Sequence, residues 1–265
     1  MTGVVRVAVV ALCLVACGTA DDARRTRVGS SDIAYATLGT AGPVVVLESG
    51  LGEDMREWRA VARALAPCVR VVMYDRPGIG RSAPRPGTAP VLADDVATQL
   101  ADLLRGIGMP PPFILVGHSL GGLYVQAFAR NRPQDVAAVV LVDASSPLEP
   151  PGVFVSTVPP SPGTIAAAEN AGIAPSVAAL LAGPPFPPVP LVVLAATDHG
   201  DTPAREALWR DVQARTAALS PQGRLEVVAG SGHFIQTDRP AAVVAAVLQV
   251  AREAGIDVSR CSFAR

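Results

Sequence analysis

The sequence contains no lysine, little charge of either sign and only three histidines. All 22 cationic side chains are arginine, charged residues make up 17% of the chain, and the formal net charge is −1. Because the chain has no basic cluster, it lacks the charge pattern with which proteins bind nucleic acid. The scattered histidines, with no cluster of cysteines, offer no ligand set for a metal. We therefore expect no nucleic-acid partner, no metal and no cofactor.

The chain is rich in apolar residues. Hydrophobic residues account for 50% of its 265 positions, and no internal repeat is visible. This composition is typical of a single compact domain with a large core. The one biased segment, residues 147–190, is rich in proline and alanine.

The N-terminal apolar run is short. Residues 7–16 follow Arg6 and fall well below the roughly 20 residues that span a bilayer. The run ends at Cys17 and resembles a bacterial lipoprotein signal, in which that cysteine becomes the lipidated first residue. We expect a signal peptide over 1–16, a linker over 17–25 and a domain over 26–265. Secretion without a lipid, after cleavage near Ala20, is the alternative.

The rest of the chain alternates strands with helices. Short apolar, β-branched runs predict strands buried on both faces of a mostly parallel sheet. Helical patterns lie between them, which predicts an α/β fold with helices on both faces and a site at the carboxyl ends of the strands. The expected strands are 33–38, 43–47, 69–74, 113–116, 136–142, 190–194 and 225–228; the expected helices are 55–65, 92–107, 120–130, 204–219 and 240–254.

Ser119 lies between a strand pattern and a helix pattern, within Gly117-His118-Ser119-Leu120-Gly121. A strand–turn–helix context is what a nucleophilic serine requires on such a sheet, where the small glycines relieve crowding. A glycine turn that only packs or binds phosphate is the alternative. We interpret Ser119 as the nucleophile.

His233 is the predicted general base. It lies in a loop of small residues between the last strand and the last helix. His118 neighbours the nucleophile, so its side chain should point away from Ser119. His199 directly follows Asp198, the favoured acid, and adjacent side chains rarely face each other across a site.

A carboxylate should orient His233 and stabilise its cation. Asp198 follows the strand 190–194 and fits the chain order serine, acid, histidine, so we favour it. Asp143, at the end of the strand 136–142, is the alternative acid, and Asp201 is a weaker one. For the oxyanion hole, the backbone N–H groups of Leu51 and Leu120 are the predicted donors.

Together these motifs resemble the α/β-hydrolase superfamily, in its branch of single-domain, esterase-like enzymes. The resemblance rests on "LESGLG" (47–52), "DRPGIGRS" (75–82), "GHSLGG" (117–122), "LVDAS" (141–145) and "GSGHFIQTDRP" (230–240). It covers residues 26–255 and implies a serine hydrolase that acts on a small acyl substrate. Asp75 and Arg76 belong to a structural turn of the family and receive no chemical role.

The segment 146–188 is a short cap by this resemblance. Its proline-rich, nearly uncharged sequence predicts two short helices, 164–171 and 176–181, over a pocket for an apolar substrate. These residues could instead simply pack on the core.

Export would leave Cys68 and Cys261 as the two remaining thiols in an oxidising compartment. In the winding that the family implies, the first and last helices share one face. We therefore expect a disulfide between these cysteines.

The resulting expectation is an exported serine hydrolase that forms an acyl-enzyme at Ser119. An aminopeptidase, a carbon–carbon bond hydrolase, an acyltransferase or a cofactor-free haloperoxidase would use the same triad. A binding module without catalysis, built on the same scaffold, is the alternative from another class.

Overall fold

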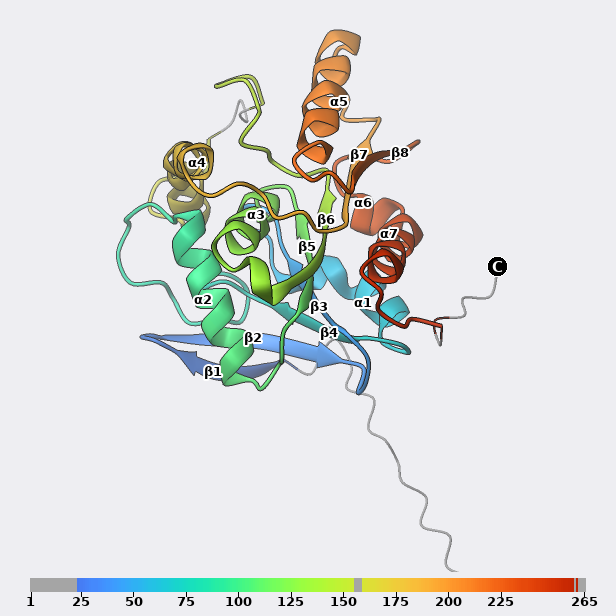
Figure 1. Ribbon diagram of the computed structural model, residues 1–265. Helices are drawn as coiled ribbons and strands as arrows, with labels where there is room; N and C mark the ends of the chain where they lie inside the picture. The colour runs from blue at the N-terminus through green and yellow to red at the C-terminus, as the bar shows by residue number, and fades with distance from the viewer. Residues whose placement is uncertain (1–22, 155–158, 260, 262–265) are drawn as a thin grey trace, which may run out of the picture.

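The computed structural model describes residues 23–154, 159–259 and 261, which form an eight-stranded sheet between two layers of helices (Figure 1). The strand order is β1-β2-β4-β3-β5-β6-β7-β8. Strands β1, β2 and β4 pair antiparallel, and every pair from β4 to β8 is parallel. The strands are β1 (Arg24–Val28), β2 (Ser31–Leu38), β3 (Val44–Glu48), β4 (Arg70–Tyr74), β5 (Phe113–His118), β6 (Val136–Val142), β7 (Leu191–Ala196) and β8 (Gly223–Val228).

Continuous apolar runs form the middle of the sheet, as predicted. All residues of β3, β5 and β7 are buried, because helices cover both faces of the sheet there. The sequence prediction missed β1, which pairs with β2 from Arg24 to Val28. Residues 24 and 25 thus belong to the sheet and not to the expected linker over 17–25. The arginine-rich sequence of β1 carries little apolar signal, since only Val28 is buried.

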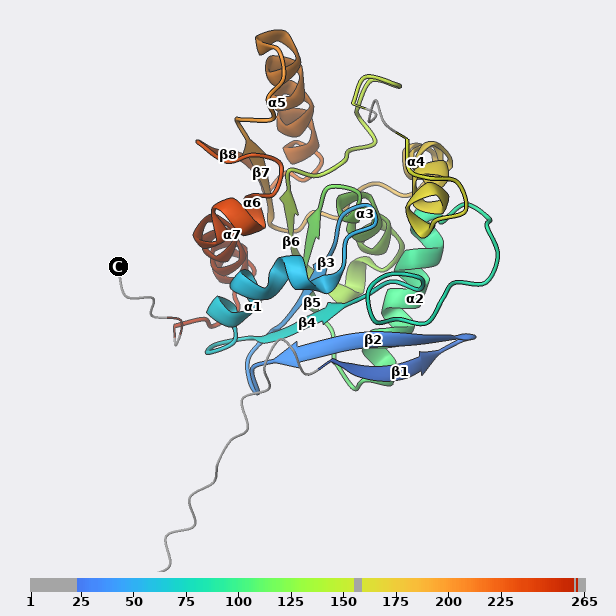
Figure 2. The ribbon, with the colours of Figure 1, turned by 180° about the vertical axis from the view of Figure 1, so that it is seen from behind.

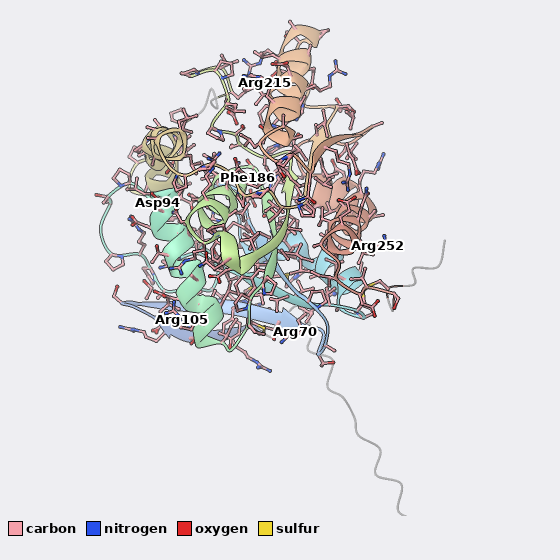
Figure 3. All side chains as sticks on the ribbon, viewed as in Figure 1. Arg70, Asp94, Arg105, Phe186, Arg215 and Arg252 are labelled. Atoms are coloured by element: carbon pink, nitrogen blue, oxygen red, sulfur yellow. A yellow bond between two sulfur atoms is a disulfide. The ribbon has the colours of Figure 1, made fainter. Side chains whose placement is uncertain are left out.

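Two groups of helices cover the sheet (Figure 2). The core on one face includes residues of α2, α3 and α4, and the core on the other includes residues of α1 and α7. Exposed arginines such as Arg105 in α2, Arg215 in α5 and Arg252 in α7 lie on the outer surfaces of the helices (Figure 3). The helices are η1 (Met55–Trp58), α1 (Arg59–Leu65), α2 (Ala93–Gly106), α3 (Gly121–Asn131), η2 (Pro133–Asp135), α4 (Ile165–Ala182), α5 (Pro203–Ala217), α6 (Ile235–Asp238) and α7 (Pro240–Glu253).

In the described part of the cap segment, one helix lies where two were predicted. Helix α4 runs from Ile165 to Ala182 and includes Pro175. Pro175 stands where the prediction separated its two helices, but the helix continues through it. By length and composition α4 could cross a membrane. However, Glu169 accepts a hydrogen bond from Arg76, and the hydroxyl of Ser176 accepts one from the N–H of Ala93. Those bonds are consistent with a helix that rests on the domain.

Cys68 and Cys261 form a disulfide with their Cα atoms 5.3 Å apart. Both residues pack against the core cluster that includes α1 and α7, as the shared face of these helices led us to expect. The bridge fastens the tail after α7 to the start of β4. The expected signal peptide over 1–16 and the expected lipidation site Cys17 lie outside the described residues.

Candidate active site

The turn between β5 and α3 holds Ser119 in a strained backbone conformation. Its φ is 50°, in the left-handed region that non-glycine residues rarely adopt. Such strain persists only where the surrounding structure enforces it, and it is concentrated at functional sites. The turn therefore presents the hydroxyl of Ser119 at the carboxyl end of β5, beyond the edge of the buried sheet.

Three glycines make this turn possible. A Cβ on Gly117 would lie 2.6 Å from the carbonyl oxygen of Gly121, and one on Gly121 would lie 2.6 Å from the carbonyl oxygen of Glu48. A Cβ on Gly122 would lie 2.4 Å from that of Ala144. The glycine pattern is thus explained by the close approach of α3 to β3, β5 and β6, which fixes Ser119 above the sheet.

His233 bridges Ser119 and Asp143. Its Nε2 lies 2.9 Å from Oγ of Ser119, and its Nδ1 lies 2.7 Å from Oδ2 of Asp143. A carboxylate only accepts hydrogen bonds, so Nδ1 carries the proton and Nε2 is free to accept from the serine. The structure thus brings together the predicted nucleophile, the predicted base and the alternative acid.

The predicted acid, Asp198, is wrong by this geometry. It is exposed, and its backbone N–H donates to the carbonyl oxygen of Ser231, 3.1 Å away. The turn after β7 directs His199, and not Asp198, toward the sheet. Asp143 is supplied instead by the neighbouring strand β6, where its own φ of 42° turns the side chain toward His233.

The carboxylate of Asp143 is fully hydrogen-bonded. Oδ1 accepts from the backbone N–H of Ala196 at 3.0 Å and from Nε1 of Trp209 at 2.8 Å. Oδ2 accepts from both His233 and His199, each at 2.7 Å. Burial alone raises the pKa of Asp143, but the hydrogen bonds from the two histidines outweigh burial and hold that pKa well below its usual range. Asp143 is therefore ionised.

His199, set aside in the sequence analysis, contacts two carboxylates. Nε2 lies 2.7 Å from Asp143, and Nδ1 lies 2.8 Å from Oε2 of Glu206 in α5. The hydrogen bond to Asp143, against the opposing effect of burial, raises the pKa of His199 to about 9. The residues next to His199 in the sequence gave no indication of this contact, because Glu206 and Asp143 lie in other elements of the fold.

The loop after β3 lies against Ser119. A Cβ on Gly50 would be 3.3 Å from that of Ser119. Arg76 donates to the carbonyl oxygens of Ser49 at 2.7 Å and Gly50 at 2.6 Å. Since a trans peptide directs its N–H opposite to its C=O, the N–H of Leu51 points away from Arg76. Within the described chain, the N–H of Leu51 has no hydrogen-bond acceptor.

Leu120 supplies a second unpaired N–H next to the serine. It precedes α3 and, within the described chain, no acceptor bonds its N–H. The N-terminal N–H groups of a helix have no partner inside the helix, so they are available to an anion. Both predicted oxyanion donors thus have unused hydrogen-bonding capacity: Leu120 directly follows Ser119, and Leu51 directly follows Gly50, whose backbone lies against Ser119.

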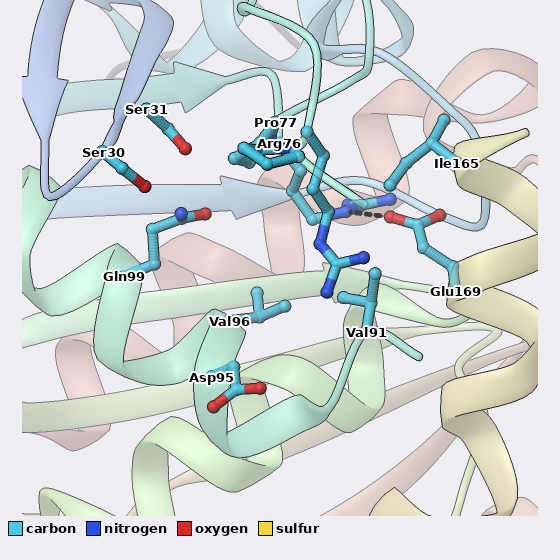
Figure 4. A pocket seen from close by; sticks show the side chains of 12 residues that line it. Ser30, Ser31, Arg76, Pro77, Val91, Asp95, Val96, Gln99, Ile165 and Glu169 are labelled. Carbon is cyan, nitrogen blue, oxygen red and sulfur yellow. Dashed lines mark hydrogen bonds and ion pairs between the residues drawn. The ribbon is translucent and has the colours of Figure 1, made fainter. Parts of the chain in front are cut away.

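Arg76 and Glu169 form a buried ion pair behind this loop. The sequence gave Arg76 no chemical role, but its Nε donates to Glu169 at 2.6 Å and its Nη1 to Glu48 at 2.7 Å. Glu169 comes from α4 and also accepts from the N–H of Gly52 at 2.8 Å. Figure 4 shows the pair beside a cavity of about 280 Å³, which neither Ser119 nor His233 lines. The pair therefore connects the cap helix to the loop that carries Leu51.

His118 supports the base through the backbone. Its Nε2 donates to the carbonyl oxygen of His233 at 3.1 Å, and its ring is buried. Burial raises the pKa of Glu57, but its interaction with His118, whose Nδ1 lies 3.3 Å from Oε2, outweighs that effect, so the pKa is lowered. His118 thus holds the loop of His233 in place.

A second cavity, of about 350 Å³, opens directly beside His233. It is lined by Phe154, Asp198, His199, Asp201, Arg205, Glu206, Trp209 and His233. The ligand atoms of Asp143, His199 and His233 lie within 4.8 Å of one another, a spacing that a metal ion also requires. In the structure these residues are hydrogen-bonded: Asp143 to both histidines, and His199 also to Glu206. The cavity is a candidate site for part of a substrate.

Comparison with known proteins identifies the family. A family model described as the alpha/beta hydrolase fold matches residues 43–187, more than half of the chain. The chain belongs to the α/β-hydrolase fold family, as its motifs indicated.

Relatives with known sequences match over different lengths. The AB hydrolase superfamily protein of Gibberella zeae is 37% identical over 98 residues, which cover 37% of this chain and 30% of that protein. The uncharacterized protein YqjL of Bacillus subtilis is 26% identical over 219 residues, 80% of this chain and 85% of that protein. This chain thus spans less than a third of the Gibberella protein.

Solved structures resemble the whole domain. A thermophilic esterase from Thermogutta terrifontis superposes with a TM-score of 0.66 at 22% identity, covering 88% of this chain and 98% of that one. The carboxylesterase CesB from Bacillus subtilis superposes with a TM-score of 0.63 at 16% identity, covering 86% and 90%. At these identities the likeness establishes the shared fold.

Proposed function

We propose that this protein is a serine hydrolase that cleaves an ester bond of a small substrate through an acyl-enzyme at Ser119. The observation that carries the proposal is the row of hydrogen bonds from Ser119 through His233 to Asp143. A strained serine with an adjacent base and an ionised acid is the arrangement that activates a hydroxyl for attack on a carbonyl.

Each group has a distinct role in this reaction. His233 accepts the proton of Ser119 as the hydroxyl attacks, and returns it to the leaving alcohol. Asp143 holds the Nδ1 proton of His233 and stabilises the imidazolium that forms. The N–H groups of Leu51 and Leu120 stabilise the oxyanion. Water, activated by His233, then attacks the acyl-enzyme and releases the acid.

The cavity beside His233 has apolar and charged walls. Phe154 and Trp209 line it together with charged or titratable side chains, whereas helix α4 above the oxyanion loop carries no charged residue except Glu169. The two aromatic side chains and α4 support an apolar acyl group in the substrate. The esterase and carboxylesterase among the structural neighbours are consistent with ester cleavage. A serine at the turn between β5 and α3 argues against the chemistry of epoxide hydrolases and haloalkane dehalogenases, which attack through an aspartate.

A panel of p-nitrophenyl esters with increasing acyl length tests this proposal, with aminoacyl anilides as the competing substrates. We expect turnover of short and medium acyl esters by the wild type. The Ser119→Ala variant should lose it. Preference for the anilides would favour an aminopeptidase, and no turnover of either class by a folded wild type would favour a binding module.

We propose further that the protein is exported and anchored through Cys17. The apolar run over 7–16 ending at Cys17 supports this, and the Cys68–Cys261 disulfide is typical of an oxidising compartment. Membrane fractionation of wild type and Cys17→Ser in a bacterial host tests it. Wild-type protein found wholly in the soluble exported fraction would refute the anchor.

A further inference from the structure

The carboxylate of Asp143 is shared by two histidines, whereas the mechanism above uses only one. His199 lies 2.7 Å from the same oxygen, Oδ2, that receives the Nδ1 proton of His233. The rings of His199 and His233 have centroids 6.3 Å apart. Any charge on His199 is therefore close to the base and to the acid.

The partners of His199 determine its protonation state. Both ring nitrogens face carboxylate oxygens, Asp143 at 2.7 Å and Glu206 at 2.8 Å. Carboxylates only accept hydrogen bonds, so both nitrogens must donate, and only the imidazolium has two N–H groups. The backbone N–H of His199 also donates to Glu206, at 3.0 Å, which fixes this glutamate in place. His199 is thus held as a cation by geometry.

We propose that His199, held as a cation by Glu206, is a positioning residue that fixes the carboxylate of Asp143 beneath His233 and extends activity to mildly acidic pH. This inference rests on the proposed function, since it concerns how the same serine is activated. A cation on the oxygen Oδ2 of Asp143 offsets part of the negative charge that this carboxylate presents to the base.

Other charged groups face this cluster and bear on its pH dependence. Asp198 and Asp201 come from the same turn as His199, and Arg205 comes from α5 and pairs with Asp201 at 2.6 Å. Burial, together with the charge of Asp143, raises the pKa of Glu149, at the start of the cap segment, to about 7. From β5, His118 faces the ring of His233, with centroids 4.7 Å apart, and pairs with Glu57. Glu206 and Asp143 are the two carboxylates that contact the ring of His199.

Histidine NMR tests the proposal without reference to activity, because the chain has only three histidines. In protein labelled with 15N-histidine, the ring of His199 should remain doubly protonated from pH 5 to 8 and lose a proton near pH 9. In His199→Gln, the acidic limb of kcat/KM on an ester should move to higher pH by about one unit.

Two further variants make the outcome specific. Glu206→Gln keeps His199 but removes the carboxylate that holds its proton, so His199 should titrate at lower pH and the acidic limb should rise. Arg215→Gln is the matched control, because it removes an exposed cation from the same helix, α5, outside the cavity, and should leave the limb in place.

The two proposals are overturned by different results. A His199 ring that titrates near its ordinary value, or an acidic limb that does not move in His199→Gln, overturns the role of His199 even in an active esterase. A wild type that hydrolyses no ester overturns the proposed function, while the titration of the His199 ring still decides the role of His199.

Discussion

Nη2 of Arg76 donates a 2.6 Å hydrogen bond to the carbonyl oxygen of Gly50, and so fixes the peptide whose N–H belongs to Leu51. The same guanidinium is paired with two buried carboxylates, Glu48 and Glu169. A cation that the motifs alone mark as structural thus sets the orientation of a predicted oxyanion donor.

Replacement of Arg76 with methionine should cost both stability and activity. It leaves Glu48 and Glu169 buried without their cation, which typically costs about 3 to 5 kcal/mol of the free energy of unfolding. Urea denaturation measures this loss. Arg105→Met is the control, because its exposed pair with Asp102 should contribute less than about 1 kcal/mol. Equal losses in the two variants would be inconsistent with the buried role of Arg76.

The acid of the triad can be identified by a matched pair of substitutions. Asp143→Asn should reduce kcat on an ester by about 10⁴-fold, because an amide favours the wrong tautomer of His233. Asp198→Asn, one strand further along the sheet, should retain activity within a few-fold. Thermal unfolding checks that both variants fold. The opposite ranking would restore Asp198 as the acid.

Stability should depend on pH through His199. Its pKa is raised from 6.5 to about 9 in the folded protein, so its contribution is fully present below pH 6.5 and is lost as the pH rises through 9. The difference in the free energy of unfolding between wild type and His199→Gln should therefore shrink from pH 6 to pH 9.5. Taking this difference cancels the effect of the buried tyrosines, whose pKa values are also raised by burial. A constant difference across this range would argue against the charged form of His199.

The disulfide should contribute substantially to stability. It closes a loop with a sequence separation of 193, for which the chain-entropy model gives about 5 kcal/mol as an upper figure. Reduction with dithiothreitol should shift the urea midpoint of the wild type downward but not that of Cys68→Ser/Cys261→Ser. Identical midpoints before and after reduction of the wild type would show that the bridge has no such effect.

The sequence predicted those parts of the fold that depend on local pattern. The local sequence already shows apolar runs at β3, β5, β6 and β7, and a strand–turn–helix pattern around Ser119. The structure has these elements at the same places. Strand β1 has no such signature, because its pairing with β2 places four of its five residues at least partly in solvent.

The parts of the site that the sequence did not predict depend on which strand end faces His233. Asp143 and Asp198 both follow parallel strands that are neighbours in the sheet, so chain order alone cannot separate them. The positive φ of Asp143 and the turn that directs His199 inward decide between them, and neither feature is encoded in residue type. The roles of Arg76 and Glu169 likewise arise from contacts 93 residues apart.

Covalent labelling can establish whether Ser119 is an activated nucleophile. Incubation with a fluorophosphonate probe, followed by mass spectrometry of the digested protein, should place one adduct on the peptide that contains Ser119. Labelling should be abolished in Ser119→Ala and strongly slowed in His233→Ala. A folded wild-type protein that acquires no adduct, or acquires one on another residue, would show that Ser119 is not the activated nucleophile.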